Sequence, residues 1–434
     1  MNDISIIGLG KLGASMLAAF ASKDFKVVGV EIDTTRADLL RQGKSFHLEA
    51  NLEELLVKHK NNITITESFH DAIKDTSTTF VVVNTPSEKD GSFSTKQLIP
   101  ACQKIGEVLK EKNDYHLVVV TCTVMPETVR KEVVPILESE SGKKLNVDFG
   151  VCYNPEFIAL GTVIHDLLNP DFVLIGESDK KAGDILQKIY EKLIEKPKIQ
   201  RITMENAEVA KIALNSYITM KISFANLLAK LCEKIPNGNV DAVTESIGLD
   251  SRIGKKYLRG AVSYGGPCFP RDNRAFSLTA KLHDCPLELP NLIDNINNNH
   301  IKHIANIVLQ YSNNGKVSIL GASYKPDSDI IDASPGIEIG KILVDNGIKV
   351  AIHDPSAINN VKRDYGSVFQ CAESINECLQ DSNVCIIVIP WKEYQNLQEK
   401  DFAKMKESVI IDCWRILKFT SDSKFKIIKI GIGN

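Results

Sequence analysis

A loop with one cysteine is the stretch of this sequence whose residue types point most directly to covalent chemistry. It runs from Tyr264 to Asp272 and reads YGGPCFPRD. Its glycines and prolines prevent a helix or strand from continuing through it. A thiolate is a nucleophile that a positive field stabilises, so Cys268, with Arg271 close behind it, is a candidate nucleophile. Taken alone, a cysteine in a turn is more often an inert, buried thiol.

A lysine and an asparagine are predicted to lie side by side on one long helix. Residues 205–233 contain few helix breakers and carry apolar residues at helical spacing, which predicts a single helix. Lys211 and Asn215 are four residues apart, so they share one face of it. An ammonium and an amide together suit a developing oxyanion, whereas the alternative is a solvated polar stripe.

Two further polar residues follow predicted strands. Glu156 lies in the loop Asn154-Pro155-Glu156-Phe157, after an apolar run, and is a candidate general base. Thr123 ends the preceding strand, where a doubly wound sheet keeps its ligand crevice. The alternatives are an exposed turn acid and a hydroxyl that caps a turn.

The N-terminal part of the chain alternates predicted strands with helices. The apolar runs are residues 4–7, 26–30, 80–83 and 117–120, with helical stretches between them. Such alternation is typical of a doubly wound α/β sheet.

A glycine-rich turn joins the first strand to the first helix, and an acid ends the second strand. In Gly8-Leu9-Gly10-Lys11-Leu12-Gly13, the first glycine allows the turn, the second admits a pyrophosphate and the third lets the helix pack on the strand. Glu31 is placed to bond a ribose diol and to repel a 2′-phosphate, so the prediction is NAD rather than NADP. The polar loops after the next two strands complete the expected cofactor set, with Thr85, Pro86 and Thr123.

A second α/β unit begins at residue 315. Its strands are predicted at residues 315–321, 349–352, 384–389 and 409–411, and the loop after the first lacks a GxGxxG. We therefore expect an α/β protein of two Rossmann-like doubly wound domains, joined by a long central helix and a helical middle domain. The expected boundaries are 1–204 for the NAD-binding domain, 205–300 for the helical domain and 301–434 for the C-terminal Rossmann-like domain.

Composition narrows the class of protein. The 434 residues are 43% hydrophobic and 25% charged, with net charge −3 and no long basic tract, which argues against a nucleic-acid partner. The N-terminus does not read as a signal peptide, and no apolar run reaches about 18 residues. The ten cysteines are scattered without metal-type pairs. We expect a cytoplasmic protein with reduced thiols and without a metal or membrane partner.

Together these motifs resemble the UDP-glucose/GDP-mannose dehydrogenase family over nearly the whole chain. This family comprises NAD-dependent, four-electron nucleotide-sugar 6-dehydrogenases, and the resemblance implies that residues 301–434 bind the nucleotide sugar. The matching segments are residues 8–13, 123–124, 154–157, 169–176, Lys211 with Asn215, 265–272, 324–326, 334–335 and 353–355.

The resemblance implies roles for individual residues. Cys268 is the implied nucleophile, Lys211, Asn215 and Asp272 hold the reacting C6 oxygen and a water, and Thr123 and Glu156 help to activate water. Arg252 is implied to reach the sugar nucleotide across a homodimer interface. Residues implied in substrate binding or anion contact are Phe157, Tyr264, Gly265, Arg259, Lys325 and Arg415.

The implied reaction explains the need for a thiol. Oxidation of a primary alcohol at C6 gives an aldehyde, which must become tetrahedral before it can lose a second hydride. Addition of Cys268 gives a thiohemiacetal, its oxidation gives a thioester, and water then releases the carboxylate. The leading case is UDP-glucose to UDP-glucuronate, a step toward polysaccharide biosynthesis.

The sequence departs from the family pattern at four positions. Leu160 replaces a second glutamate after the NPEF loop, which puts one water-organising carboxylate in doubt. Asp332 replaces an arginine often used for phosphate contact, so nucleotide contacts at that position are also in doubt. Arg271 replaces a lysine and keeps its charge, and Pro267 stands where a small residue is common.

Other functions are compatible with parts of this pattern. The same chemistry on a UDP-N-acetylhexosamine, GDP-mannose or another nucleotide sugar keeps every motif. A two-electron β-hydroxyacid dehydrogenase shares the fold and a helical lysine and asparagine but needs no cysteine. Leu160 and Asp332 also prompt a non-catalytic nucleotide-sugar binder.

Overall fold

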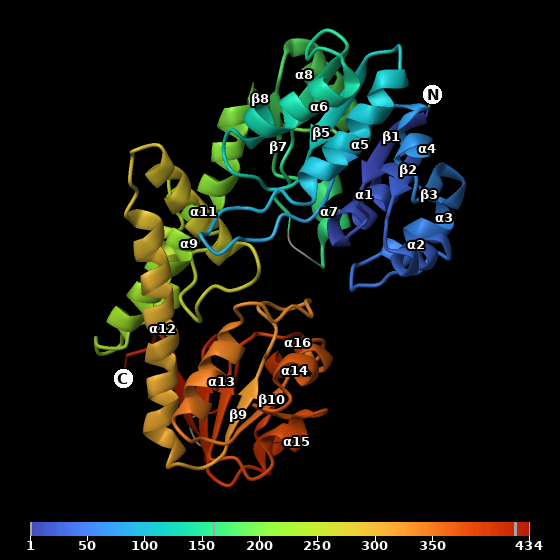
Figure 1. The fold of residues 1–434 in the computed structure, drawn as a ribbon. Coiled ribbons are helices and arrows are strands. Elements are labelled where there is room, and N and C mark those ends of the chain that lie inside the picture. The colour runs from blue at the N-terminus through green and yellow to red at the C-terminus, as the bar shows by residue number, and fades with distance from the viewer. Residues whose placement is uncertain (1, 159–160, 421–422, 434) are drawn as a thin grey trace. The chain divides into compact units, whose positions relative to one another are not determined.

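The protein forms two compact units. The computed structural model describes residues 2–158, 161–420 and 423–433 (Figure 1). The contacts within the chain divide it after Ala213, and we call the parts before and after this point the first and second unit. Helix α9, Met204–Cys232, runs through the division, so one continuous helix carries residues of both units.

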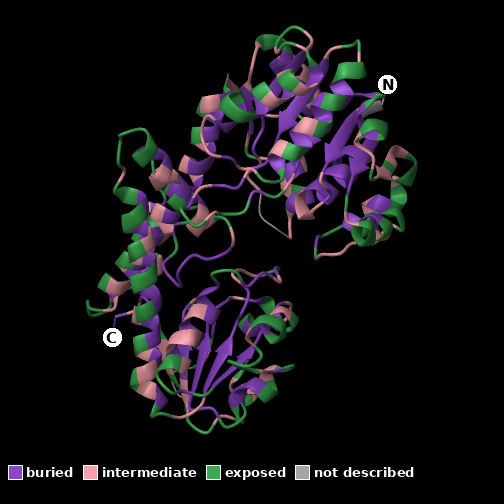
Figure 2. Cartoon of the chain, in the orientation of Figure 1, coloured by how far each residue is buried: buried purple, intermediate pink, exposed green. Residues whose placement is uncertain are grey.

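The first unit is built on an eight-stranded sheet. The strand order is β3-β2-β1-β4-β5-β6-β7-β8, and every pair is parallel except β6 with β7. The strands are β1 Asn2–Ile7, β2 Val27–Val30, β3 Ile63–Thr66, β4 Thr76–Val81, β5 His116–Val120, β6 Phe149–Tyr153, β7 Val173–Glu177 and β8 Ile199–Thr203. The central strands are buried throughout (Figure 2), as expected for parallel strands covered on both faces.

Helices cover both faces of this sheet. Residues of α1, α3, α7 and α8 join one hydrophobic cluster, while those of α4, α5, α6 and the start of α9 join another. The helices are α1 Lys11–Ser22, α2 Thr34–Arg41, α3 Leu52–Lys58, α4 Phe69–Ile73, α5 Leu98–Glu111, α6 Val134–Ser141, α7 Val163–Leu168 and α8 Lys180–Leu193. This arrangement places the loops after the parallel strands at one edge of the sheet.

Strand β4 begins earlier than its apolar run predicts, because buried hydroxyls satisfy one another. Ser5 Oγ lies 2.7 Å from Thr79 Oγ1, which in turn lies 2.8 Å from His116 Nε2. Thr76 and Thr78 are also buried. Residues that look polar in the sequence are thus part of the central sheet.

The second unit combines helices with a six-stranded parallel sheet. The strand order is β11-β10-β9-β12-β13-β14. The strands are β9 Val317–Leu320, β10 Val350–His353, β11 Gln370–Cys371, β12 Val384–Ile387, β13 Val409–Asp412 and β14 Lys426–Lys429. The helices are α10 Val240–Ile247, α11 Phe269–Leu282, α12 Leu289–Ser312, α13 Pro335–Asp345, α14 Ile358–Tyr365, α15 Ile375–Leu379 and α16 Lys392–Gln395.

Helix α12 ties the helical part of the second unit to its sheet. Its C-terminal half buries Ile301, Ile304 and Val308 in the cluster that also contains the strands of this sheet. The expected α/β class, with two Rossmann-like sheets, a long helix α9 and a helical middle region, is confirmed. No helix in the described parts of the chain is long and apolar enough to cross a membrane.

Candidate active site

The turn between β1 and α1 has the geometry that its glycines predict. Gly8 adopts φ of 93°, and a Cβ at this position would lie 2.6 Å from the Val82 carbonyl oxygen. A Cβ at Gly13 would lie 2.0 Å from the Gly8 carbonyl oxygen, so only glycine lets α1 approach the strand. At Gly10, by contrast, an added Cβ would have no described atom within 4 Å. Gly10 therefore faces open space.

The amino end of α1 is open to an anion. Lys11 and Leu12 are its first residues, and no side chain of the described residues caps it. The backbone N–H groups at a helix N-terminus, together with the helix dipole, favour a phosphate at such a position.

Glu31 lies directly after β2, beside this turn. Its side chain is buried and accepts hydrogen bonds from the backbone N–H groups of Leu9 at 3.2 Å and Asp33 at 3.0 Å. The Arg36 Nη1 atom lies 4.0 Å from Glu31 Oε2. These contacts orient the carboxylate at the carboxyl edge of the sheet.

The loops after β4 and β5 meet at the same edge. The Thr85 hydroxyl donates to the Thr123 carbonyl oxygen at 2.7 Å. Strands β4 and β5 are neighbours, so Thr85, Pro86 and Thr123 follow two adjacent strands. The predicted cofactor residues therefore all follow β1, β2, β4 or β5.

Glu156 follows β6 and lies in a partly buried environment. The Tyr190 hydroxyl of α8 lies 3.1 Å from Glu156 Oε1 and 2.6 Å from Asn154 Oδ1. Burial raises the pKa of Glu156 to about 7, although Tyr190 and Lys211 act to lower it. A carboxyl with a pKa near neutrality is suited to take a proton in one step and return it in another.

Lys211 binds the same loop. Its Nζ donates to the Glu156 backbone carbonyl oxygen at 2.6 Å and lies 4.8 Å from the centre of the Phe157 ring. Lys211 is buried, so the alternative of a solvated stripe does not hold for this residue. The first unit thus brings Glu156, Phe157 and Lys211 together.

Cys268 lies at the amino end of α11, in the second unit. It is the N-cap residue of this helix, and its side chain is exposed. Cys285 is the other exposed cysteine of the described residues, and it does not begin a helix. The partial positive charge at a helix N-terminus stabilises a thiolate, which suits Cys268 to nucleophilic chemistry.

Asp272, one turn after Cys268, is fully buried and paired. Asn215 donates from Nδ2 to Asp272 Oδ2 at 2.6 Å, and Arg271 donates from Nε to Oδ1 at 3.0 Å. Asn215 lies one turn beyond Lys211 on α9. Helix α9 therefore carries a residue of each polar set.

The cysteine loop packs closely on the loop that follows β9. A Cβ at Gly265 would lie 2.2 Å from the Ala333 carbonyl oxygen, and Gly266 donates its N–H to the Asp332 carbonyl oxygen at 2.9 Å. A Cβ at Gly266 would press on the Tyr324 ring at 2.7 Å. Both glycines are required by this close approach.

The second sheet repeats the glycine contact of the first without its sequence motif. Gly321 has φ of 114°, and a Cβ at Gly336 would lie 2.0 Å from its carbonyl oxygen. This pair matches Gly8 with Gly13, but the loop that contacts the cysteine loop is inserted between its two members.

The acidic residue after β10 is Asp354, and its carboxylate is hydrogen-bonded by groups of the protein itself. Asp354 accepts hydrogen bonds from the backbone N–H groups of Ala322, Ser323, Ser356 and Ala357 and from the Trp391 side chain. In the first sheet, the corresponding Glu31 has fewer such partners. The two Rossmann-like sheets therefore differ at the position where a dinucleotide's ribose is normally bound.

Comparison with known proteins identifies the family. Residues 2–194, 205–299 and 318–419 match the NAD binding, central and UDP binding domains of the UDP-glucose/GDP-mannose dehydrogenase family. A UDP-glucose 6-dehydrogenase of Haloferax volcanii is 32% identical over 96% of this chain and 97% of its own. A GDP-mannose 6-dehydrogenase of Pseudomonas syringae is 34% identical over 92% of this chain and 93% of its own.

A solved structure of a protein with a related name has a fold similar to that of this chain. A UDP-glucose dehydrogenase from Pyrobaculum islandicum superposes with a TM-score of 0.90 at 28% identity, over 100% of this chain and 98% of that one. The chain belongs to the UDP-glucose/GDP-mannose dehydrogenase family. It is an NAD-dependent nucleotide-sugar dehydrogenase with NAD as cofactor and a nucleotide sugar as substrate. The family assignment sets aside the β-hydroxyacid dehydrogenase and the non-catalytic binder.

The first unit fits NAD. The uncapped end of α1 and the open space at Gly10 suit a pyrophosphate, while Glu31 suits a ribose diol. When bound there, NAD supplies the hydride acceptor of the reaction.

Two glycine substitutions are expected to separate cofactor binding from folding. Gly10→Ala has room for its methyl group in the protein but places it where the pyrophosphate approaches. We expect the KM for NAD to rise about tenfold, equivalent to about 1.4 kcal/mol, with no change in urea unfolding. Gly13→Ala meets the Gly8 carbonyl oxygen instead and is expected to lose about 1–3 kcal/mol of unfolding free energy. Equal effects of both substitutions on unfolding would contradict the assignment of these two glycines.

The structure favours a structural role for two residues that were expected to bind substrate. Arg415 donates to both carboxylate oxygens of Asp241 and to the carbonyl oxygens of Gly260, Cys413 and Ile430, which uses all five of its N–H donors. Tyr264 is buried, and its hydroxyl bonds Asp294 and Asn273. Contact of these two side chains with an anion or the sugar stays a prediction.

Other expected residues keep exposed or partly exposed positions. Arg252 is 86% exposed and paired with Asp250, and its contact across a dimer stays a prediction. The Arg259 guanidinium lies 5.5 Å from the Trp414 ring, and Lys325 Nζ lies 5.9 Å from the Tyr324 ring. The departure at Leu160 lies outside the described residues, whereas Asp332 is exposed in the loop after β9.

The sequence did not point to Tyr190 as a partner of Glu156. Tyr190 is on α8, 34 positions from Glu156, and its helical spacing marks it as an ordinary core residue. The signal that could have found it is the buried phenol itself, because a buried hydroxyl needs a hydrogen-bond partner.

Proposed function

We propose that this protein oxidises the C6 hydroxymethyl group of UDP-glucose to a carboxylate and so forms UDP-glucuronate. The observation that carries the proposal is the exposed Cys268 thiol at the start of α11, one turn from the buried Asp272–Asn215 pair. A two-electron alcohol oxidation has no use for such a thiol. A four-electron oxidation does, because its aldehyde must be captured before it is oxidised again.

The first oxidation converts the C6 alcohol to an aldehyde. Lys211 and Asn215, one turn apart on α9, hold the C6 oxygen as its proton departs through a water bound to Asp272. Their donors stabilise negative charge on this oxygen.

The second oxidation proceeds on the enzyme. The Cys268 thiolate forms a C–S bond with the aldehyde carbon as the carbonyl π bond opens, which gives a thiohemiacetal oxyanion. Loss of a hydride from C6 restores the carbonyl group and leaves a thioester. The same Lys211 and Asn215 side chains stabilise the oxyanion before the hydride leaves.

Hydrolysis completes the reaction. Glu156 takes a proton from water as the water oxygen attacks the thioester, and the C–S bond breaks to release carboxylate and thiolate. One sugar nucleotide, two NAD⁺ and one water yield one carboxylate, two NADH and three protons. The pKa of Glu156 near 7 supports its role as the base.

UDP-glucose is proposed as substrate because two similar proteins carry that name. The Haloferax volcanii relative covers nearly the full length of both chains, and the Pyrobaculum islandicum structure has the same fold over all of this chain. The similar identity to a GDP-mannose 6-dehydrogenase supports GDP-mannose as the second candidate.

A panel of nucleotide sugars tests both parts of the proposal. UDP-glucose, UDP-N-acetylglucosamine, UDP-N-acetylmannosamine and GDP-mannose are each supplied with NAD, and NADH and sugar products are quantified. We expect the highest kcat/KM with UDP-glucose and two NADH per glucuronate. A higher kcat/KM with GDP-mannose would overturn the substrate, whereas one NADH per aldehyde would overturn the chemistry.

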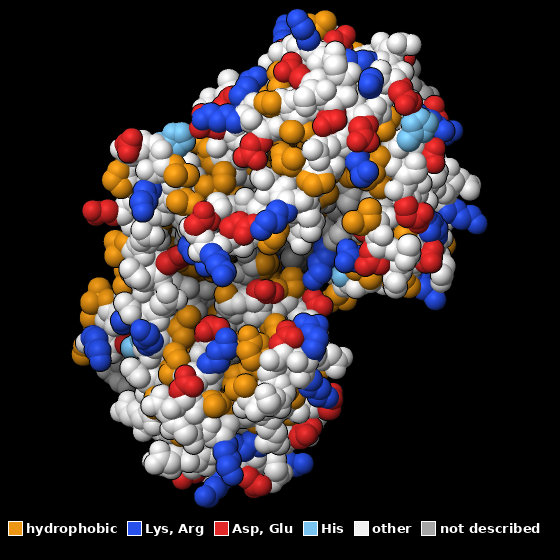
Figure 3. Space-filling view, viewed as in Figure 1, with side chains coloured by type: hydrophobic (Ala, Val, Ile, Leu, Met, Phe, Trp, Pro, Cys, Tyr) orange, Lys and Arg blue, Asp and Glu red, His pale blue; other side chains and the backbone are white. Residues whose placement is uncertain are grey.

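A homodimer is the proposed assembly. Helix α9 exposes Tyr217, Phe224, Leu227 and Leu231 at successive spacings of seven, three and four residues, so they form one apolar stripe. Figure 3 shows hydrophobic side chains along the edge of the molecule where α9 and α12 lie. An apolar stripe of this kind suits a second copy of the chain. Sedimentation analysis is expected to show a dimer that Phe224→Glu and Leu231→Glu together dissociate, whereas a monomeric wild-type protein would contradict it.

A further inference from the structure

The segment Ala261–Tyr264, which leads into the cysteine loop and includes its first residue, is buried but belongs to no helix or strand. Its backbone groups therefore need partners from elsewhere, because unpaired backbone groups are rarely buried. Side chains of α9 and α12 provide several of these partners.

Asn226 of α9 binds the start of the segment. Its Oδ1 accepts the Ala261 N–H at 2.9 Å, and its Nδ2 donates to the Val262 carbonyl oxygen at 3.0 Å. Both of its polar ends are thus used on one short stretch of backbone.

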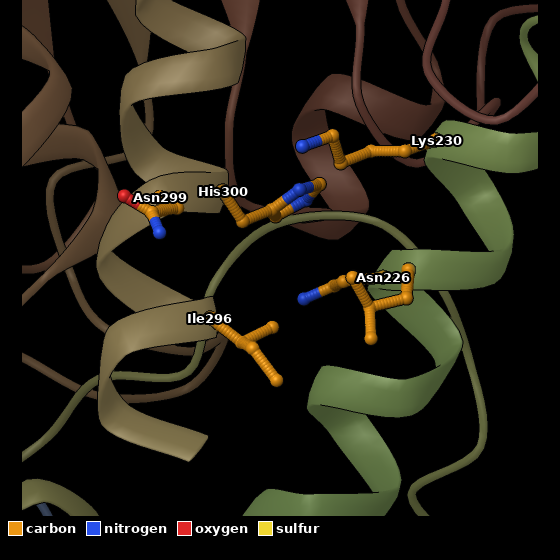
Figure 4. A pocket seen from close by; sticks show the side chains of 6 residues that line it. Asn226, Lys230, Ile296, Asn299 and His300 are labelled. Atoms are coloured by element: carbon orange, nitrogen blue, oxygen red, sulfur yellow. The ribbon is translucent and has the colours of Figure 1, made fainter. Parts of the chain in front are cut away.

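His300 of α12 binds the Ala261 carbonyl oxygen at 2.8 Å through Nε2. A carbonyl oxygen only accepts, so Nε2 carries the proton. Burial lowers the pKa of His300 to about 4, which keeps the ring neutral. Figure 4 shows Asn226 and His300 pointing toward one another from α9 and α12, at the wall of a cavity of about 120 Å³.

Asn297, one turn before His300, binds the end of the segment. Its Oδ1 accepts the Tyr264 N–H at 2.9 Å, and its Nδ2 donates to the Tyr264 carbonyl oxygen at 3.0 Å. This paired bonding reproduces what a neighbouring strand would provide. Asn226, Asn297 and His300 are all buried, and we call them the side-chain clamp.

The clamp ends where the cysteine loop begins. Gly265 follows Tyr264 directly, the next residue bonds the Asp332 carbonyl oxygen, and Cys268 lies two residues further. The Tyr264 ring is held as well, because its hydroxyl bonds Asp294 and Asn273. Only a few residues therefore separate the side-chain clamp from the Cys268 thiol, and these residues are tightly packed.

We propose that the side-chain clamp is a set of positioning residues that hold Cys268 where it captures the aldehyde before it escapes. The inference rests on the proposed four-electron function. Displacement of a reacting group by about 1 Å costs about 100-fold in rate, so a loosened loop affects the thiol's step most. Oxidation of the alcohol to the aldehyde does not use the thiol and is spared.

Asn297→Ala tests the proposal against its neighbour Asn298→Ala. Asn298 is exposed on the same helix and is the matched control. Hydroxylamine present during turnover traps escaped aldehyde as an oxime, and NADH, oxime and carboxylate are quantified. We expect Asn297→Ala to slow the thiol's step about 10- to 100-fold, so that oxime appears and NADH per carboxylate exceeds two. Asn298→Ala is expected to behave like the wild type.

A second pair of variants covers the case in which Asn297→Ala does not fold. His300→Gln keeps an N–H that reaches the Ala261 carbonyl oxygen, whereas His300→Leu has a similar volume and no donor. Aldehyde escape with His300→Leu, restored toward the wild type by His300→Gln, supports a positioning role. The ratio of oxime to carboxylate does not depend on how much enzyme is folded, so mere destabilisation leaves it unchanged.

Thiol reactivity gives an independent measurement on the full chain. Without substrate, the iodoacetamide alkylation rate of Cys268 is compared with that of Cys285, which is also exposed. We expect this ratio to change at least about twofold in Asn297→Ala and not in Asn298→Ala, because loop position alters access and field.

The outcomes separate the two proposals. If the wild-type protein does not yield two NADH per carboxylate, the proposed four-electron function is wrong. If it does, and the clamp variants lose rate without releasing aldehyde or altering the alkylation ratio, the function stands and the positioning role is overturned.

Discussion

Replacing Cys268 with alanine is expected to abolish carboxylate formation while leaving the first oxidation in place. Without the thiol, the aldehyde cannot form a thiohemiacetal on the enzyme, so no second hydride is lost by this route. We expect carboxylate formation to fall about a thousandfold or more, since removal of a nucleophile forfeits most of its catalytic effect. Single-turnover experiments with UDP-glucose and NAD are expected to give one NADH and an aldehyde that hydroxylamine traps.

Cys285→Ala is the matched control for this substitution. Cys285 is also exposed but lies beyond the end of α11 rather than at its start. Its loss is expected to leave both the rate and the yield of two NADH per sugar unchanged. Full four-electron turnover by Cys268→Ala would show that another group captures the aldehyde.

Glu156→Gln is expected to trap the enzyme at the thioester. The amide cannot take a proton from water, so hydrolysis loses general base catalysis, worth about 100- to 10,000-fold. Glutamine keeps an oxygen that accepts from the Tyr190 hydroxyl, so local packing is retained. Intact-protein mass spectrometry during turnover is expected to show Cys268 carrying the acyl group, with a burst of two NADH per site. Glu195→Gln, an exposed acid just after α8, is the control and is expected to show no burst.

The pH dependence of hydrolysis follows from the same carboxyl. Burial raises the pKa of Glu156 to about 7, and the base must be ionised to act. Hydrolysis in the wild type is therefore expected to rise with pH to about 7 and then level off. This rise of the hydrolysis rate with pH is expected to be absent in Glu156→Gln. Its persistence in that variant would assign the base to another group.

The stability of the fold is expected to depend on this carboxyl in the opposite sense. A carboxyl whose pKa is raised in the folded protein favours the protonated form, so its contribution is complete below the ordinary pKa near 4.5 and is lost as pH rises through about 7. Thermal midpoints of the wild type and Glu156→Gln are therefore expected to diverge as pH rises from 5 to 8, with the variant becoming relatively more stable.

Much of the first unit could be predicted from sequence because its signals are local. Gly8, Gly10 and Gly13 encode a turn and a close contact within six positions. Glu31 and Thr123 were found as polar residues that end apolar runs. The carboxyl ends of parallel strands share one sheet edge, so the positions of these residues follow from the strand pattern alone.

The second sheet contains a glycine contact that local sequence signals do not reveal. Its turn makes the same contact as the first, between Gly321 and Gly336, but an inserted loop separates the two glycines and hides the motif. That loop contacts Gly265 and Gly266, about 70 residues earlier in the chain. Periodicity describes which face of an element is buried, but it does not describe which distant loop lies against it.

Residue type and spacing alone marked Cys268 as a candidate nucleophile and the first turn as a dinucleotide site, because both depend on neighbours along the chain. The tertiary structure decided which residues are hydrogen-bonded to one another. It directed all of Arg415's donors into the protein, paired Tyr190 with Glu156 and placed Asn226, Asn297 and His300 around the segment before the thiol. These partners are determined by buried polar groups that must find a hydrogen bond from residues far away in sequence, and no local pattern records that requirement.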